Sequence, residues 1–257
     1  MTTSVQPAAQ TTPKPTIVLV HGAWADASSW DAVIQRLQRE GYPVLAAPNP
    51  LRGMPVDAPY IASILASVEG PIILVGHSYG GAVISNAADG NPNVKALVYI
   101  AADIPDVGET LLTLNGQAGG SHINPETSLI VREYPAADGS TGHDAYIKPE
   151  LFQQIFAADL PASKTALMAA TQRPLDVGSL FIPSAAAAWK TIPSYCMVAT
   201  QDNTIGTANV RFMAERACDT PVEVDASHVV MISQPDAVAD LIVTAARSIA
   251  AVAPIGR

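Results

Sequence analysis

A serine between two glycines directly follows an apolar run and precedes a helix-like segment. Residues 76–80 read Gly-His-Ser-Tyr-Gly, residues 71–75 form the apolar run, and residues 82–88 have a helical pattern. This is the G-x-S-x-G pattern in the strand–turn–helix context that exposes a serine hydroxyl. The sharp turn strains the serine backbone, and the glycines remove the side chains that would clash there. The sequence therefore predicts a buried strand ending at Ser78, a candidate nucleophile.

The composition excludes several classes of partner. The chain has 257 residues, of which 49% are hydrophobic, enough for one large domain with a sizeable core. Its net charge is −9 and it has no basic run. Nucleic acid is therefore not an expected partner, because phosphate binding needs clustered Lys and Arg. A membrane is not expected either, since no run approaches the roughly 20 apolar residues of a membrane span.

The N-terminal segment, residues 1–15, is polar and rich in Pro and Thr. We expect it to be a flexible tail. It lacks the apolar stretch of a signal peptide, so the expected location is the cytoplasm.

The two cysteines, Cys196 and Cys218, fall in a predicted core strand and near the end of a predicted helix. Neither belongs to a C-x-x-C pair or a His-rich cluster, so no zinc site is predicted. We interpret them as buried small apolar residues, and a disulfide between them stays open.

Strand-like and helix-like segments alternate along most of the chain. The predicted strands are residues 16–20, 42–47, 72–75, 94–101, 194–200 and 221–224, and the predicted helices among them are residues 30–40, 60–68 and 235–251. Apolar runs without polar alternation are typical of strands buried on both faces. The fold class is therefore α/β, with a mostly parallel central sheet and helices on both faces.

This alternation lapses across residues 103–191. Helices are predicted there at residues 149–158 and 163–171, with loop-rich stretches at 116–120 and 135–142. We expect residues 16–102 and 192–257 to form the core and residues 103–191 to be a helical cap insertion over the carboxyl ends of the strands. The residues expected to line the substrate pocket are Trp24, Phe152, Phe156, Trp189 and Met231.

A serine hydroxyl needs a base to accept its proton, and His228 is the candidate among five histidines. In enzymes with this strand–turn–helix serine, the acid and then the histidine follow the serine along the chain, and His228 alone lies in a late loop after the last predicted strand. The acid that orients it is expected to be Asp202, which follows the strand at residues 194–200. The rivals are Asp103 and Asp106, after the preceding strand, and Asp225, close to the histidine.

The attack creates an oxyanion that needs preorganised N–H donors. One donor should be the N–H of Tyr79, the residue after the nucleophile. The other should come from the loop after the first strand, where the N–H of Ala23 is preferred and that of Trp24 is the alternative.

Four motifs in the expected order resemble the α/β-hydrolase superfamily: His-Gly-Ala-Trp at 21–24, Gly-His-Ser-Tyr-Gly-Gly at 76–81, Gln-Asp at 201–202 and Ser-His at 227–228. The nearer likeness is to the small-esterase branch that includes plant methylesterases and hydroxynitrile lyases. In those lyases a Thr replaces the glycine found here as Gly22, and a Lys follows the catalytic His, where this chain has Val229. The resemblance thus implies a serine esterase. A serine in place of a nucleophilic Asp argues against a dehalogenase or an epoxide hydrolase.

From these residues and this resemblance we expect a hydrolase that cleaves small apolar carboxylic esters through a Ser-His-Asp triad and an acyl-enzyme intermediate. No metal and no organic cofactor are implied. An acyl-homoserine lactone type of lactonase, an amidase or a carbon–carbon bond hydrolase would use the same groups, and a non-catalytic ligand receptor is a third class. The oligomeric state stays open, with a homodimer as one alternative.

Overall fold

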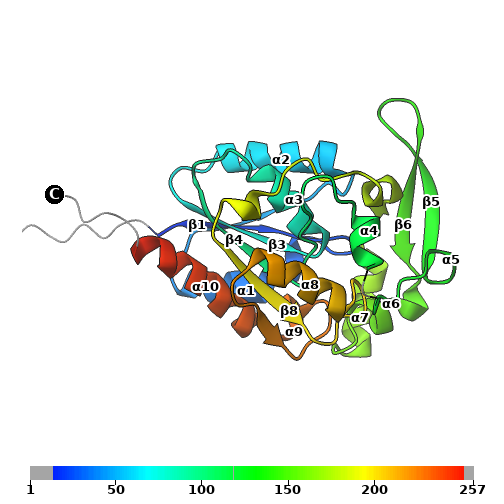
Figure 1. The fold of residues 1–257 in the computed structure, drawn as a ribbon. Coiled ribbons are helices and arrows are strands. Elements are labelled where there is room, and N and C mark those ends of the chain that lie inside the picture. The colour runs from blue at the N-terminus through cyan, green and yellow to red at the C-terminus, as the bar shows by residue number, and fades with distance from the viewer. Residues whose placement is uncertain (1–13, 118, 252–257) are drawn as a thin grey trace, which may run out of the picture.

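A six-stranded parallel sheet forms the centre of the molecule in the computed structural model, which describes residues 14–117 and 119–251 (Figure 1). The strand order is β2-β1-β3-β4-β8-β9, and each neighbouring pair is parallel. The strands are β1 (Thr16–Val20), β2 (Val44–Ala47), β3 (Ile72–His77), β4 (Val94–Ile100), β8 (Ser194–Ala199) and β9 (Val222–Val224). β3 is buried along its whole length, as its continuous apolar sequence predicted. Most of the expected tail, residues 1–13, lies outside the described residues.

Helices cover both faces of the sheet, so the predicted fold class is confirmed (Figure 1). α1 packs against α10 on one face and α2 packs against α3 on the other, while α8 contacts β8. The bounds are η1 (Ala27–Trp30), α1 (Asp31–Arg39), α2 (Met54–Ala66), α3 (Tyr79–Ala87), α8 (Thr207–Ala217), α9 (Val230–Ser233) and α10 (Pro235–Ala251). Within the described residues, no helix is long and apolar enough to cross a membrane.

The second helix begins at Met54, six residues before the predicted start at residue 60. Pro55 occupies its first turn, where a missing N–H costs nothing, and Pro59 lies inside the helix. An internal proline normally breaks a helix, so the sequence pattern before residue 60 does not indicate this start.

Most of the segment between β4 and β8, residues 103–191, gathers at one end of the molecule, whereas its last part, with η3, runs back beside α3 (Figure 1). Its elements are α4 (Leu111–Asn115), α5 (Pro125–Ser128), β5 (Leu129–Pro135), β6 (Thr141–Ile147), α6 (Pro149–Phe156), α7 (Ala162–Thr171), β7 (Leu175–Asp176), η2 (Val177–Leu180) and η3 (Ala188–Lys190). The two predicted helices correspond to α6 and α7. The antiparallel sheet β5-β6-β7 was not predicted, because half-exposed strands rich in polar residues carry no clear alternation.

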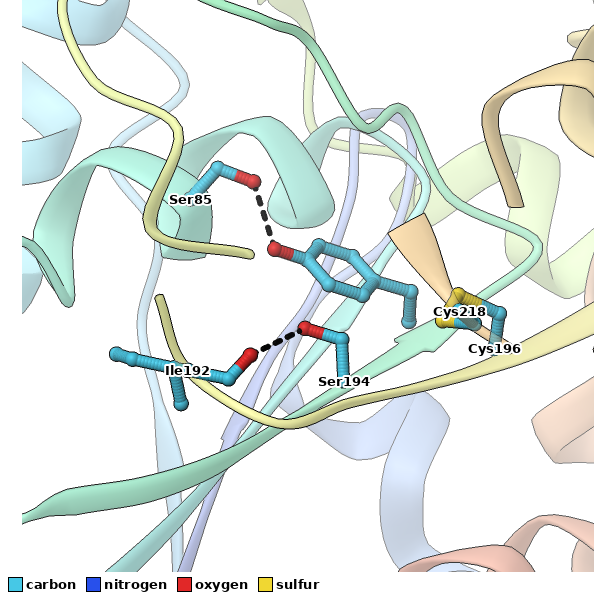
Figure 2. The surroundings of a disulfide bond; sticks show 6 residues. Ser85, Ile192, Ser194, Cys196 and Cys218 are labelled. Carbon is cyan, nitrogen blue, oxygen red and sulfur yellow. Dashed lines mark hydrogen bonds between the residues drawn. A yellow bond between two sulfur atoms is a disulfide. The ribbon is translucent and has the colours of Figure 1, made fainter. Parts of the chain in front are cut away.

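The two cysteines form a disulfide, which corrects their interpretation as separate apolar residues. Cys196 in β8 is bonded to Cys218 at the end of α8, and both are buried (Figure 2). The bond joins the helix to the sheet near a small polar group in which the hydroxyls of Ser85 and Tyr99 lie 2.8 Å apart. Sequence spacing alone could not pair the cysteines, because β8 and α8 must first be placed side by side.

The double variant Cys196→Ala/Cys218→Ala should lose about 3 kcal/mol of unfolding free energy, because the bond closes a loop with a sequence separation of 22. Urea unfolding without reductant would measure this loss. Wild-type protein unfolded in dithiothreitol is the matched control and should show the same lowered midpoint. An unchanged midpoint in the variant, or two free thiols in denatured wild-type protein, would contradict the assignment.

Candidate active site

Ser78 lies on the sharp turn between β3 and α3. Its backbone is left-handed, with φ 54° and ψ −129°, a conformation that a residue with a side chain adopts only under strain. The turn is closely packed: a Cβ at Gly80 would lie 2.6 Å from the Val20 carbonyl oxygen, and one at Gly81 would lie 2.5 Å from the Asp103 carbonyl oxygen. The Ser78 carbonyl accepts N–H groups from Gly81 at 2.8 Å and Asp103 at 3.1 Å. The side chain of Ser78 is therefore held at the carboxyl edge of the sheet.

His228 and Asp202 form a buried pair on the loops that follow β9 and β8. Nδ1 of His228 lies 2.7 Å from Oδ2 of Asp202. The other carboxylate oxygen accepts the N–H groups of Thr204 at 2.8 Å and Ile205 at 3.0 Å. A carboxylate fixed in this way keeps the proton on Nδ1 and leaves the lone pair of Nε2 free. Nε2 of His228 is buried and has no hydrogen-bond partner among the described residues.

His77 connects the histidine loop to the serine turn. Its ring centroid lies 4.7 Å from that of His228, and its Nε2–H donates to the His228 carbonyl oxygen at 3.0 Å. Burial lowers the pKa of His77 well below its usual value, so the ring is neutral. Because His77 precedes Ser78 in the chain, this contact places His228 beside the turn that carries the serine.

The candidate oxyanion donors, the N–H groups of Ala23 and Tyr79, belong to residues that line the same cavity as Ser78. Tyr79 is the first residue of α3, where N–H groups have no acceptor within the helix. The N–H of Trp24, the alternative to Ala23, donates to the Arg173 carbonyl oxygen at 2.9 Å. Trp24 is thereby occupied, which leaves Ala23 as the better donor.

His21 fixes the loop that carries Ala23. Its Nδ1–H donates to the Gly22 carbonyl at 2.9 Å, and its Nε2 accepts the Asn49 N–H at 3.0 Å. Burial lowers the pKa of His21 to about 4, so the ring is neutral and structural. A Cβ at Gly22 would lie 2.6 Å from Cβ of Ser78, so only glycine lets this loop approach the serine.

The three rival acids have other surroundings. Asp106 pairs with Lys190 at 2.6 Å, and Asp225 accepts a hydrogen bond from the Gln201 amide at 2.6 Å. Asp103 is buried at the cavity, with Oδ1 unpartnered among the described residues. Burial raises the pKa of Asp103 to about 7; the charge of His228 and a hydrogen bond from Asn115 oppose this shift only in part.

A cavity of about 370 Å³ lies beside Ser78. Its walls are mainly apolar and include Leu111, Leu112, Leu129, Val131, Leu175 and Phe181. All of these residues belong to the segment 103–191, whereas Ser78, Tyr79 and Ala23 form the floor. Among residues 14–117 and 119–251, no group of three or more His, Cys, Asp or Glu side chains could hold a metal ion.

The five residues predicted to line the pocket lie in three different surroundings. Trp24 lines the cavity, whereas Phe152, Phe156 and Met231 are buried in side-chain packing. The ring centroid of Phe156 lies 5.3 Å from that of His228, so Phe156 packs against the histidine ring. Trp189 lies in a separate hollow, with its indole N–H donating to the Pro105 carbonyl at 2.9 Å. Aromatic residue type alone could not separate pocket walls from packing.

Residues that sequence analysis missed tie the segment 103–191 to the acid and histidine loops. Asp159 accepts the N–H of Ser227 at 3.0 Å, and also its hydroxyl. Although burial acts to raise it, these hydrogen bonds lower the pKa of Asp159. The hydroxyl of Thr204 donates to the Ile155 carbonyl at 2.8 Å. No local motif marks these contacts, because each joins residues that are distant in the chain.

Asp57 is a second residue that the sequence did not single out. The phenol of Tyr79 donates to its Oδ2 at 2.6 Å, and the N–H groups of Arg52 and Gly53 also bond to the carboxylate. Burial raises the pKa of both Asp57 and Tyr79. The contact directs the Tyr79 phenol to Asp57 of α2 and fixes the residue that follows Ser78.

Comparisons with known proteins identify the family of this chain. The model described as "Alpha/beta hydrolase family" matches residues 17–241. "Pyrethroid hydrolase" from Sphingobium wenxiniae is 30% identical over 56% of this chain and 55% of its own length. "Carbendazim hydrolyzing esterase" from Nocardioides sp. is 35% identical over 43% of this chain and 50% of its own length. The chain therefore spans about half the length of these two relatives.

A solved structure of polyneuridine aldehyde esterase resembles the fold, with a TM-score of 0.76 over 90% of this chain and 98% of that one. The sequence identity is 18%, so this likeness concerns the fold alone.

The burial of Asp103 predicts that the unfolding free energy of the protein depends on pH. Its pKa of about 7 lies above the ordinary 3.8, so as pH rises the unfolded chain loses the proton first and the native state is progressively disfavoured. Asp103→Asn should therefore gain about 2 to 4 kcal/mol of unfolding free energy between pH 4 and pH 8, relative to wild type. Urea unfolding at both pH values measures this difference.

Asp106→Asn is the control. Its hydrogen bond with Lys190 lowers the pKa of Asp106, so this partly exposed carboxylate stabilises the fold above its ordinary pKa. Asp106→Asn should therefore lose unfolding free energy relative to wild type as pH rises, the opposite sign to Asp103→Asn. A pH-independent effect of Asp103→Asn would contradict the burial of an ionisable Asp103.

Proposed function

The chain belongs to the alpha/beta hydrolase family, and from this premise we propose that it is a serine hydrolase that cleaves carboxylic esters. The observation that carries the proposal is the buried Asp202–His228 pair, in which Oδ2 and Nδ1 lie 2.7 Å apart. Nε2 of His228 has no partner among the described residues, and the His228 carbonyl oxygen accepts a hydrogen bond from His77, the residue before Ser78. The names of the two curated relatives, a hydrolase and a hydrolyzing esterase, support the same class of reaction.

In the proposed first half-reaction, Oγ of Ser78 attacks the ester carbonyl carbon while Nε2 of His228 accepts the hydroxyl proton. Asp202 stabilises the imidazolium that forms, because its carboxylate is already fixed by two backbone N–H groups. The negative charge moves onto the carbonyl oxygen, toward the N–H groups of Ala23 and Tyr79. When the tetrahedral intermediate collapses, His228 returns the proton to the departing alcohol and an acyl-enzyme remains.

In the second half-reaction, water takes the place of the alcohol. His228 accepts a proton from the water, the hydroxyl oxygen attacks the acyl carbon, and the proton returns to Ser78 as the carboxylic acid leaves. Neutral His21 and His77 do not compete for this proton, because burial holds the pKa of both below the usual value.

We infer further that residues 103–191 act as a cap over this site. Leu111, Leu129, Val131 and Leu175 from this segment line the cavity above Ser78. A largely apolar wall favours apolar acyl or alcohol groups, because their burial is favourable at about 25 cal/mol per Å². Excluding water from the cavity also strengthens the hydrogen bonds to the oxyanion.

The compartment remains a prediction. A cytoplasmic location was expected from the sequence, whereas the disulfide between Cys196 and Cys218 is more typical of oxidising compartments. Thiol labelling of the protein inside intact cells would decide between the two.

Ser78→Ala should lower kcat on p-nitrophenyl esters by about 10⁴-fold or more while the melting temperature stays close to that of wild type. A stopped turnover assay and a fluorophosphonate probe would measure activity and labelling. Ser63→Ala, which changes an exposed serine hydroxyl on α2, is the control and should keep both. Labelling of Ser78→Ala at the wild-type rate would overturn the assignment of the nucleophile.

His228→Ala should lose activity to a similar extent, whereas Asp202→Asn should retain more because the histidine stays in place with a weaker partner. The same esters together with lactones and anilides would rank the competing bond types. Activity of Asp202→Asn equal to that of wild type would contradict its role as the orienting acid.

A further inference from the structure

The Asp103 side chain has one partner in the protein, the side chain of Asn115, which lines the same cavity. The backbone holds this residue: its N–H donates to the Ser78 carbonyl at 3.1 Å, and Gly81 packs against its carbonyl oxygen. The residue is only 3% exposed, and its Oδ1 has no hydrogen-bond partner among the described residues. A buried carboxyl without a full set of partners is destabilising, so its presence needs a reason outside the packing of the loop.

The side chain borders the cavity of the proposed active site. Asp103 and Ser78 line the same cavity, as does Asn115 of α4. Oδ1 of Asn115 is also buried and unpartnered among the described residues. Two polar side chains with unused hydrogen-bonding capacity therefore meet in a cavity whose other walls are mostly apolar.

We propose that Asp103, beside Asn115, is a specificity-determining residue that hydrogen-bonds a donor group of the substrate close to the scissile carbonyl. The preferred substrates would be mainly apolar esters that carry one hydroxyl, N–H or ammonium group near the reacting bond. This inference rests on the proposed esterase function and names a substrate class for it.

The physical basis is the cost of leaving a buried polar group unpaired. A substrate with a suitable donor completes the hydrogen bonds of the carboxyl, whereas an analogue without one buries that carboxyl unsatisfied. The loss of one such hydrogen bond corresponds to a discrimination of about 10- to 100-fold. The pKa of Asp103, raised to about 7 by burial, means that the group can be present at neutral pH either as an acceptor or as a donor.

The test compares matched esters. The probes are medium-chain ethyl esters with a hydroxyl on the α, β or γ carbon of the acid, and esters with a hydroxyl on the alcohol side. Each hydroxy ester is compared with its methyl ether, its amino counterpart and the unsubstituted ester. Wild-type kcat/KM should favour the best hydroxy or amino ester over its matched analogue by about tenfold or more. A higher kcat/KM for the amino ester than for the hydroxy ester would identify an ionised Asp103. A higher kcat/KM for the hydroxy ester would identify an uncharged Asp103.

Asp103→Leu should lower this preference by about tenfold and raise kcat/KM on the unsubstituted ester, because it removes the unpaired carboxyl. Asp103→Asn keeps an oxygen acceptor and should retain part of the preference; it is also the informative variant if the leucine protein fails to fold. Asp106→Asn, on the same loop but paired with Lys190, is the control and should keep the wild-type preference.

The inference fails if wild-type enzyme hydrolyses all esters without regard to the donor, or if both Asp103 variants keep the wild-type ratio. That outcome leaves the esterase function standing. Absence of any ester hydrolysis by wild-type protein, in contrast, would overturn the proposed function itself.

Discussion

The structure of the site depends on the close approach of three backbone segments at the carboxyl edge of the sheet. The turn of Ser78, the loop after β1 and the loop after β4 approach so closely that a Cβ at Gly22, Gly80 or Gly81 would lie 2.5–2.6 Å from a neighbouring atom. This packing holds Ser78 in its left-handed conformation, with φ 54°. The strain is tolerated because β3, which leads into the turn, is buried throughout and is paired with β1 and β4 on its two sides.

The loops of Asp202 and His228 are held by contacts with the end of β3 and with the segment 103–191. His77 holds the backbone of His228, Phe156 packs against its ring, and Asp159 bonds the residue before it. Thr204, next to the acid loop, is tied to Ile155. The segment 103–191 therefore both lines the cavity and supports the groups proposed to move the proton. A change in α6 should alter turnover, because Phe156 packs against the ring of His228, whereas other residues of the segment line the cavity.

The sequence predicted the parts of the fold and site that depend on local pattern. Buried apolar runs marked the parallel strands, and the glycine-rich turn marked Ser78, because both signals lie within a few neighbouring residues. Phe152 and Trp189 were expected in the pocket but lie elsewhere, since aromatic character does not encode direction. The sheet β5-β6-β7, the disulfide and the Asp159–Ser227 contact all join distant residues, so they follow only from the folded chain.

The polar groups buried near Ser78 separate into two kinds. His21, Asp57 and Asp202 have their hydrogen bonds supplied by the protein, and each fixes a loop or a ring. His228 Nε2 and Asp103 Oδ1, in contrast, have no hydrogen-bond partner among the described residues. An unpartnered buried atom is not in itself a sign of function, since Trp30 Nε1 is another and lies in the core. What distinguishes Asp103 is that it lines the cavity of the candidate nucleophile, while the loop after β4 is held by backbone hydrogen bonds and by side chains other than that of Asp103. A group with these properties can be satisfied by a ligand, and the same reasoning makes the free Nε2 of His228 the natural acceptor for the serine proton.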